Sequence, residues 1–300
     1  NTIIGNVMYK NEGAITFEQC SGNEVSQNAY YQNSKTGMQF KGGSDNRIIN
    51  NTGFDTDTAG LMLSDSTNNL ISGNTFYNNF FGGILLFNDS GDTLTDNTVF
   101  GNNPMNLAIF GIIPGGIVVV GSKNNLFQNN LVYNKTPYGI GFLPAFQYPG
   151  SSNNIVTWNK ISNSSLYGIY IDSSDNNNFS NNEVFDQRKT IGTYIVNSTG
   201  TILENEHFYR NGFDFSINST IQSMDIKLKK VVFDAFEGRY DNETMLSLND
   251  TLRKGDSYSI RWATNSTRPP EGRFSVKRKY VNMSTTADLL IDAITWHWSD

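Results

Sequence analysis

A six-residue phrase returns nine times along this 300-residue chain, and its spacing constrains the fold more than any other feature. Successive starts are 22, 23, 23, 23, 33, 29, 23 and 23 residues apart, which is a 23-residue repeat with two insertions. A fixed period of this length is typical of solenoid proteins, in which each repeat stacks on the next. The phrase starts at Asn1, Asn23, Asn46, Asn69, Asp92, Asn125, Asn154, Asn177 and Gly200.

Three positions counted from each start keep their chemical character. The third is apolar: Ile3, Val25, Ile48, Ile71, Leu94, Phe127, Val156, Phe179 and Ile202. The sixth is asparagine: Asn6, Asn28, Asn51, Asn74, Asn97, Asn130, Asn159, Asn182 and Asn205. The ninth is aromatic except in one repeat: Tyr9, Tyr31, Phe54, Tyr77, Phe100, Tyr133, Ser162, Phe185 and Phe208. These columns predict coils of short strands joined by asparagine turns and stacked about 4.8 Å apart.

The phrase Asn-x-Ile-x-x-Asn-x-x-Phe-x-Asn, followed by Gly-Ile-x-Leu, resembles the NosD-like repeat of the pectin-lyase-like β-helix superfamily. Residues 167–177 are close to its consensus, and the resemblance covers residues 1 to about 216. It implies an all-β fold, a right-handed parallel β-helix of about nine coils. It is unspecific for function, because such families include polysaccharide lyases, hydrolases, epimerases, copper-site accessory proteins and archaeal or bacterial surface proteins.

A change in composition after residue 218 predicts a second domain. Asparagine becomes rarer, charge rises, and segments such as 224–233 and 273–280 alternate between apolar and polar residues. We therefore predict a parallel β-helix over residues 1–218 and a small immunoglobulin-like β-sandwich over residues 219–300, which caps the carboxy-terminal end of the helix.

The charge of the chain excludes two classes of partner. The formal net charge is −6 at pH 7 and no basic run occurs, so we expect neither nucleic acid nor an anionic membrane surface as a partner. No apolar segment approaches the roughly 18 residues of a membrane span. The single cysteine, Cys20, permits no disulfide within the chain, and we expect it to pack in the core.

Asn-x-Ser/Thr sequons are frequent, and four of the eleven lie in the predicted sandwich, where asparagine is less common. This distribution favours N-glycosylation and an extracellular location at the cell surface. The candidates are Asn50, Asn88, Asn134, Asn163, Asn178, Asn197, Asn218, Asn242, Asn249, Asn265 and Asn282. For three of them, Asn50, Asn178 and Asn197, the alternative interpretation is that tight packing prevents attachment of a glycan.

The strand that contains Gly-Ile-x-Leu has a predictable outer face, and that face shows no catalytic set. Its middle repeats are apolar and lack the paired carboxylates, histidine or basic residue that glycoside hydrolysis and uronate chemistry require. Four acids at the turns, Asp65, Asp89, Asp172 and Asp175, are expected to cap the backbone. We therefore predict no catalytic residues.

No metal set is predicted either. The two histidines, His207 and His297, have no ligand spacing, and His207 is expected to point inward. The copper role attached to the NosD name does not carry over. Ca²⁺ bound by turn oxygens stays an alternative without a motif, and no other cofactor is expected.

Both insertions, residues 104–114 and 144–149, bring apolar loops beside the apolar outer stripe. Such loops either cover the stripe or join it in a patch for a partner. We hypothesise that they fold over the stripe and build an interaction surface, with plain covering within the chain as the alternative. Its predicted members are Met62, Leu85, Phe87, Phe110, Val118, Val120, Leu143, Phe146 and Tyr148.

The ninth-position aromatic residues have two interpretations. Strict alternation places them outside, as a stacked column that binds sugars or a neighbouring molecule. A strand bend would instead turn them into a second inward layer.

Together these features favour a glycosylated structural or adhesive surface protein, resembling archaeal or bacterial surface members. It would self-assemble into a filament, sheath or surface layer, with itself or other surface proteins as partners. The alternative is a carbohydrate-active enzyme (polysaccharide lyase, hydrolase or epimerase) or a non-catalytic carbohydrate-binding module, with polysaccharide as the partner. Clustered acids around Asp65 and Asp89, or a groove lined by Tyr138, Phe146 and Tyr148, would support that alternative.

Overall fold

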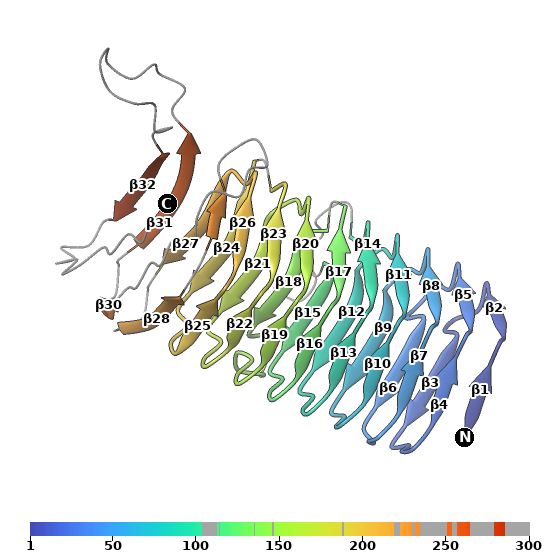
Figure 1. Ribbon diagram of the computed structural model, residues 1–300. Coiled ribbons are helices and arrows are strands. Elements are labelled where there is room, and N and C mark those ends of the chain that lie inside the picture. The colour runs from blue at the N-terminus through green and yellow to red at the C-terminus, as the bar shows by residue number, and fades with distance from the viewer. Residues whose placement is uncertain are drawn as a thin grey trace, which may run out of the picture.

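The computed structural model describes eleven segments of the chain: residues 1–103, 113, 115–134, 136–145, 147–187, 189–218, 223–229, 232–234, 251–253, 257–264 and 279–285. Beyond residue 217 only the backbone is described, apart from Ile226. The described residues form β-strands and turns, and the strands line up in three sheets along one axis (Figure 1).

Each coil gives one strand to each sheet. Sheet A consists of β1 (Thr2–Ile4), β4 (Glu24–Ser26), β7 (Arg47–Ile49), β10 (Leu70–Ser72), β13 (Thr93–Thr95), β16 (Leu126–Gln128), β19 (Ile155–Thr157), β22 (Asn178–Ser180), β25 (Thr201–Glu204), β28 (Ser223–Lys229) and β30 (Thr251–Arg253). Sheet B consists of β2 (Val7–Tyr9), β5 (Ala29–Tyr31), β8 (Thr52–Phe54), β11 (Thr75–Tyr77), β14 (Thr98–Phe100), β17 (Leu131–Tyr133), β20 (Lys160–Ser162), β23 (Glu183–Phe185), β26 (His207–Tyr209) and β29 (Val232–Asp234). Sheet C consists of β3 (Ile15–Glu18), β6 (Met38–Lys41), β9 (Ala59–Ser64), β12 (Gly82–Phe87), β15 (Ile117–Val120), β18 (Tyr138–Leu143), β21 (Tyr167–Asp172), β24 (Ile191–Val196), β27 (Phe213–Asn218), β31 (Ser257–Thr264) and β32 (Lys279–Thr285).

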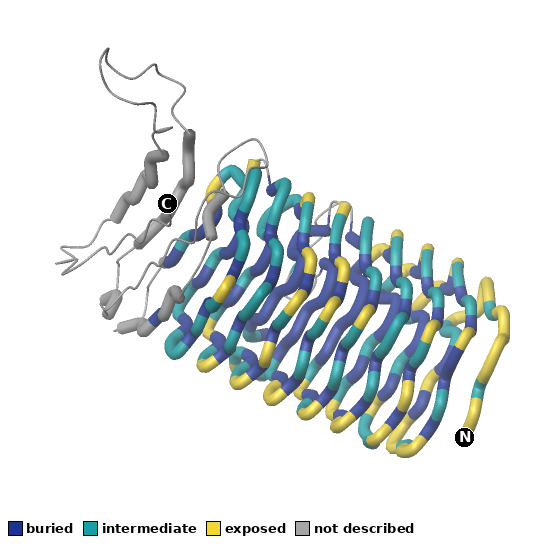
Figure 2. The backbone as a smooth tube through the Cα atoms, in the orientation of Figure 1, coloured by how far each residue is buried: buried dark blue, intermediate teal, exposed yellow. Residues whose placement is uncertain are grey.

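Neighbouring coils pair in parallel and in register, as Ile3, Val25 and Ile48 do along sheet A. The fold prediction, an all-β parallel β-helix of about nine coils, is therefore confirmed. Its interior is filled by one continuous cluster of apolar side chains that runs the length of the helix, which appears as the dark blue lining of the tube in Figure 2. One coil buries too little apolar surface to be stable alone, so stacking supplies the core.

Buried asparagines connect the coils at the corner between sheets A and B. In the sixth-position column, Asn74 Oδ1 accepts hydrogen bonds from the main-chain N–H and the Nδ2 of Asn51, at 2.9 and 3.0 Å. In the next coil, Asn97 Oδ1 accepts hydrogen bonds from the main-chain N–H and the Nδ2 of Asn74. Asn130 Oδ1 accepts the corresponding two hydrogen bonds from Asn97. Each side-chain amide oxygen therefore accepts a hydrogen bond from a buried main-chain N–H of the previous coil. A side chain without an oxygen at this position would leave that N–H unpaired.

The same corner requires left-handed backbone in every coil. All nine residues at the fifth position have φ between +52° and +68°: Gly5, Gln27, Asn50, Gly73, Asp96, Asn129, Trp158, Asn181 and Asn205. Glycine and asparagine adopt this conformation at low cost, which explains their frequency here. Trp158 is the one bulky side chain in the column.

The predicted register of the ninth coil is wrong by one residue. Phe179 pairs with Leu203 instead of Ile202, and Phe185 pairs with Tyr209 instead of Phe208. The extra residue lies in the preceding coil, because Ser164 N–H donates to Gln187 across 23 residues, whereas Tyr167 pairs with Ile191 across 24. The segment Gly200–Asn205 imitates the repeat phrase and conceals this shift.

The shift puts a carboxylic acid into the asparagine column. Glu206, not Asn205, takes the sixth position, and its Oε1 accepts from the main-chain N–H and the Nδ2 of Asn182 at 3.1 and 2.8 Å. Asn205 is instead exposed in the left-handed corner position.

Parallel pairing continues past the predicted domain boundary at residue 218. Strand β28 pairs in parallel with β25, and β29 with β26, so a tenth coil begins within the segment assigned to the sandwich. Strand β31 then pairs antiparallel with β27, and β32 with β31, which extends sheet C. The immunoglobulin-like sandwich itself stays a prediction, because most of residues 219–300 lie outside the described part.

Candidate functional site

The apolar stripe on the outer face of sheet C is covered by the chain itself. Leu85, Val118, Val120 and Leu143 are at most 4% exposed and form a second apolar cluster with their neighbours. Covering within the chain, the alternative considered from the sequence, therefore applies to these four side chains. They are not available to a partner in this structure.

The remaining predicted members of the interaction surface are less buried or not described. Met62, Phe87 and Tyr148 are half-buried against the same cluster. Tyr148 packs over Gly121 and its main chain exchanges two hydrogen bonds with Ala145. Phe110 and Phe146 lie outside the described residues, as does most of the first insertion. Use of this region as an interaction surface stays a prediction.

Next to the stripe, four tyrosines from strands β18, β21 and β24 form a cluster on the outer face of sheet C. The ring of Tyr138 lies 4.9 Å from that of Tyr170 and 6.0 Å from that of Tyr167. Tyr194 lies 5.0 Å from Tyr167 and 5.9 Å from Tyr170. Tyr138 is buried, whereas the other three rings are half-exposed. We call these four residues the tyrosine cluster.

One carboxylate contacts the cluster. The Tyr170 hydroxyl donates to Asp172 Oδ2 at 3.0 Å, and Ser173 Oγ donates to the other oxygen of Asp172 at 2.8 Å. Burial, with Tyr167 and Asp172 nearby, raises the pKa of Tyr138 to about 12, and burial with the same carboxylate raises the pKa of Tyr170 further. The phenols of Tyr138 and Tyr170 therefore stay protonated and act as hydrogen-bond donors, not as bases.

Two of the four turn acids, Asp89 and Asp175, cap the backbone as expected, whereas Asp65 and Asp172 accept hydrogen bonds from side chains. Asp89 is buried and accepts from the main-chain N–H of Ser66 and of Phe87, both at 2.8 Å. Asp175 accepts from the main-chain N–H of Thr199 at 2.9 Å, while exposed Asp65 accepts from Asn88 Nδ2. Asp65 and Asp89 therefore hold the turns together.

Three carboxyl groups among the described residues have a raised pKa, and all are out of reach of a large substrate. Burial raises the pKa of Asp89 well above its usual range, that of Asp92 to about 7 and that of Glu206 to about 8. Their exposed fractions are 0 to 1%.

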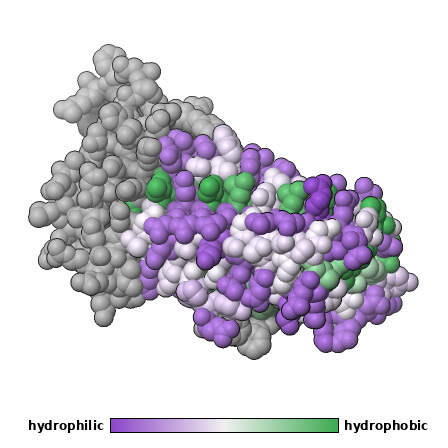
Figure 3. All heavy atoms as spheres, turned by 90° about the horizontal axis from the view of Figure 1, so that it is seen from below, coloured by the Kyte–Doolittle hydropathy of each residue, from purple (hydrophilic) through white to green (hydrophobic). Residues whose placement is uncertain are grey.

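The ninth-position aromatics lie outside, on sheet B, as the first of the two interpretations has it. Six rings from Tyr9 to Tyr133 stack face to face with centroids 4.8 to 5.2 Å apart. Phe185 and Tyr209 continue the column at 4.7 Å, with Ser162 between the two parts. On the face shown in Figure 3, apolar residues gather in a few separate clusters among hydrophilic residues and residues of intermediate hydropathy.

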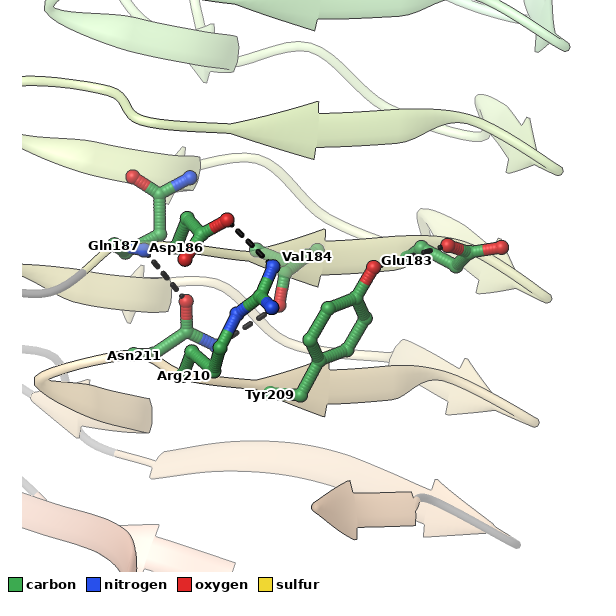
Figure 4. Close-up of polar contacts among 7 residues, drawn as sticks. All are labelled: Glu183, Val184, Asp186, Gln187, Tyr209, Arg210 and Asn211. Atoms are coloured by element: carbon green, nitrogen blue, oxygen red, sulfur yellow. Dashed lines mark hydrogen bonds and ion pairs between the residues drawn. The ribbon is translucent and has the colours of Figure 1, made fainter. Parts of the chain in front are cut away.

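Beside this column, coils seven to nine carry an ionisable patch that the sequence analysis missed. Lys160 Nζ lies 3.2 Å from Glu183 Oε1, and the Tyr209 hydroxyl donates to Glu183 Oε2 at 3.2 Å. Arg210 donates to Asp186 at 2.6 Å, and its guanidinium lies over the Tyr209 ring (Figure 4). The acids of this patch are therefore held by cationic and phenolic partners.

The register shift explains why this patch was missed. His207 pairs with Glu183 and lies outward at the seventh position, so its expected inward orientation is wrong. Read in the correct register, the seventh position holds Lys160, Glu183 and His207 after six repeats without a titratable group, which is a signal the sequence does contain.

The structure locates several of the predicted N-glycosylation sites but does not test whether they carry glycans. Four sequon asparagines, Asn50, Asn88, Asn134 and Asn163, are exposed in left-handed corners. Asn178 and Asn197 are half-buried, and Asn282 lies in β32. Of the other sites only the backbone of Asn218 is described, and Asn242, Asn249 and Asn265 lie outside the described residues.

Within the described segments, no group of three or more His, Cys, Asp or Glu side chains is arranged to hold a metal ion. Those segments also contain no helix of the length and hydropathy that a membrane crossing needs.

Comparison with solved structures finds the same fold in carbohydrate-active proteins. The chain is similar to an alginate lyase from Paenibacillus sp. str. FPU-7, with 10% identity and a TM-score of 0.52 over 73% of this chain and 95% of that one. It is also similar to the periplasmic alginate epimerase AlgG, with 16% identity and a TM-score of 0.44 over 71% and 63% of the two chains. Other neighbours include an α-1,3-glucanase and a bacteriophage tailspike. At such identities the likeness shows the fold alone.

Sequence comparison gives the family. No curated protein sequence matches the chain. The model of a right-handed β-helix region matches residues 1–132 and 106–234, which together exceed half of the chain. The fold is therefore the right-handed parallel β-helix, and the chain belongs to the right-handed β-helix family.

Proposed function

We propose that this protein binds a neutral polysaccharide on the outer face of sheet C, with the tyrosine cluster as the contact surface. The observation that carries the proposal is the set of half-exposed rings of Tyr167, Tyr170 and Tyr194, packed within 5.0 to 5.9 Å of one another. Aromatic rings with a polar hydroxyl suit a ligand that is apolar on its ring faces and polar at its edges, as a pyranose is.

The electrostatics favour a neutral glycan over an acidic one. Asp172 is the charged group that contacts the cluster in the described part of the chain, and the whole chain carries a net charge of −6. A uronate polymer would be repelled by this carboxylate, whereas a sugar hydroxyl can donate to it.

Binding without turnover is supported by the protonation states. The phenols of Tyr138, Tyr167 and Tyr170 are held protonated by their raised pKa, and the acids with raised pKa lie inside the helix, where no polysaccharide reaches them. A hydrolase needs two reachable carboxyl groups in different protonation states, so the described residues support a binding role better than carboxyl-based hydrolysis.

Replacing Tyr170 with alanine is expected to weaken polysaccharide binding by at least about tenfold, because Tyr170 contacts the other three rings and positions Asp172. Replacing it with phenylalanine keeps the ring and removes only the hydroxyl, so the loss should be smaller. Affinity electrophoresis against neutral and acidic polysaccharides measures both effects, and the thermal midpoint of each variant checks folding.

The matched control is Tyr31→Ala, which removes a tyrosine of sheet B and should leave this binding unchanged. Equal affinity of wild type and Tyr170→Ala would reject the tyrosine cluster as the site. Release of reducing ends from a polysaccharide that the protein binds would show that the protein is an enzyme, and would contradict a binding role without turnover.

An extracellular surface location, N-glycosylation and the narrower relationship to NosD-like surface proteins belong to the same proposal. Their support is the repeat phrase, the sequons and the exposure of Asn50, Asn88, Asn134 and Asn163. Self-assembly into a filament or layer, and Ca²⁺ binding, stay predictions from the sequence.

A further inference from the structure

The outer aromatic column of sheet B has one missing ring. Ser162 pairs with Tyr133 on one side and with Phe185 on the other. Tyr133 uses one ring face to stack on Phe100 at 5.0 Å, and Phe185 uses one to stack on Tyr209 at 4.7 Å. Their other faces look toward each other across the serine.

The gap has the dimensions of one ring. Coils stack at about 4.8 Å, so Tyr133 and Phe185 are separated by two steps, roughly 10 Å. A ring inserted midway would lie about 5 Å from each neighbour, which is the spacing of the stacked pairs in this column. Such a pair of parallel faces is a preformed sandwich for a ring.

The edge of the gap is polar and nearly charge-neutral. Lys160, in the same strand as Ser162, lies 3.2 Å from Glu183, and exposed Asn163 follows at the corner. The ion pair with Glu183 neutralises Lys160, so a phosphate group would find no free cation at this edge. An aromatic side chain of another protein would fill the gap but would offer no hydrogen-bond partners to Lys160, Glu183 and Asn163. A pyranose offers apolar faces to the two rings and hydroxyls to the edge.

The same coil exposes Trp158 without a packing reason. Its side chain is 57% exposed and its φ is +59°, in a column otherwise filled by glycine, asparagine, aspartate and glutamine. A bulky residue in left-handed backbone is strained, and such strain is a marker of functional sites. Trp158 lies four residues before Ser162, at the corner between sheets A and B that precedes β20. Four residues of chain span at most about 14 Å, a length that a short oligosaccharide covers.

We propose that the gap at Ser162 binds one pyranose ring of a neutral oligosaccharide between Tyr133 and Phe185, and that the sugar chain crosses the outer face of sheet B to Trp158. This site lies on a different sheet from the tyrosine cluster and does not depend on it.

The test fills the gap. In the Tyr170→Ala background, which weakens the site on sheet C, Ser162→Tyr supplies the missing ring of the column. The double variant should fold normally and bind neutral oligosaccharides of glucose, mannose or galactose at least about tenfold more weakly than Tyr170→Ala alone in calorimetric titration. Trp158→Asn introduces the residue common at this corner and should weaken binding less, by about threefold or more. Thr52→Tyr adds the same ring to sheet B at a distance and should leave the affinity unchanged.

Tyr170→Ala separates this proposal from the polysaccharide site on sheet C, because it should leave oligosaccharide binding at the gap intact. In the Tyr170→Ala background, equal affinity with and without Ser162→Tyr in a folded protein would overturn the proposal. So would the absence of binding by the wild type to every oligosaccharide of the set.

Discussion

Replacing Asp92 with asparagine is expected to make the protein more stable than the wild type at pH 8, by about 3 to 4 kcal/mol. Asp92 stands in the first-position column of asparagines, where its Oδ1 accepts from the main-chain N–H and the Nδ2 of Asn69 at 2.7 and 3.0 Å. Its Oδ2 is buried and has no hydrogen-bond partner in the described part of the chain. Burial raises the pKa of Asp92 to about 7, against the opposing effect of the two hydrogen bonds from Asn69.

The direction of the pH dependence follows from this shift. The pKa of Asp92 is about 7 in the folded state and near the ordinary aspartate value of 3.8 in the unfolded chain. Between those values the folded state keeps a proton that the unfolded state releases, so the contribution to the free energy of unfolding falls as pH rises from about 4 to about 7 and is constant above. Asparagine has no such step and adds an amide donor, as its neighbours in the column have.

The measurement is urea unfolding of both proteins between pH 4 and pH 8. The difference between the two free energies of unfolding removes the contribution of Glu206, whose pKa is also raised by burial. It retains the repulsion between Asp92 and Asp89, which raises the pKa of Asp89 in addition to burial. Asp96→Asn is the control for the loss of one carboxylate at an exposed corner of the same coil. A constant difference for Asp92→Asn across this range would contradict the assignment.

The interior of the helix was predictable because its signal is local and repeated. The outer face predicted for the Gly-Ile-x-Leu strand implies that its Ile and Leu positions point inward. The side chains at these positions, from Ile15 and Phe17 to Ile169 and Ile171, are all buried. Alternation along a strand decides which face a residue occupies, and many equivalent coils average out single exceptions.

The ninth coil shows where this inference fails. A one-residue insertion moves every following side chain to the other face of its strand, so Glu206 enters the core column and His207 leaves it. The segment Gly200–Asn205 matches the repeat phrase by chance. Aligning the coil on this match gives a register that fits the consensus and hides the one-residue insertion. Spacing alone could not decide between the two registers.

The candidate sites depend on contacts between coils, which local patterns do not specify. Tyr138 and Tyr167 are 29 residues apart and Tyr170 and Tyr194 are 24 apart, because insertions of different length separate them. The gap at Ser162 was visible in the sequence as the one non-aromatic residue of its column. Its significance needed the knowledge that the column lies outside and that its rings stack face to face.

Replacing Asn97 with alanine is expected to destabilise the protein by about 3 kcal/mol, since one buried asparagine serves two coils. Its Oδ1 accepts from the main-chain N–H and Nδ2 of Asn74, and its Nδ2 donates to Ile71 O and to Asn130 Oδ1, all at 2.9 to 3.0 Å. Alanine leaves the Asn74 N–H without its acceptor inside the helix, where an unpaired donor costs about 1 to 3 kcal/mol, and removes two further donations.

The control for this substitution is Asn6→Ala, which removes an exposed member of the same column and should cost well under half as much, because water replaces the lost partners. Denaturant unfolding gives both values. Because neighbouring coils stabilise one another in a solenoid, the Asn97 variant should also broaden the transition as the two halves of the helix uncouple. If both variants lose a similar amount of unfolding free energy, the asparagine column stabilises each turn locally. Coupling between coils through the column would then be wrong.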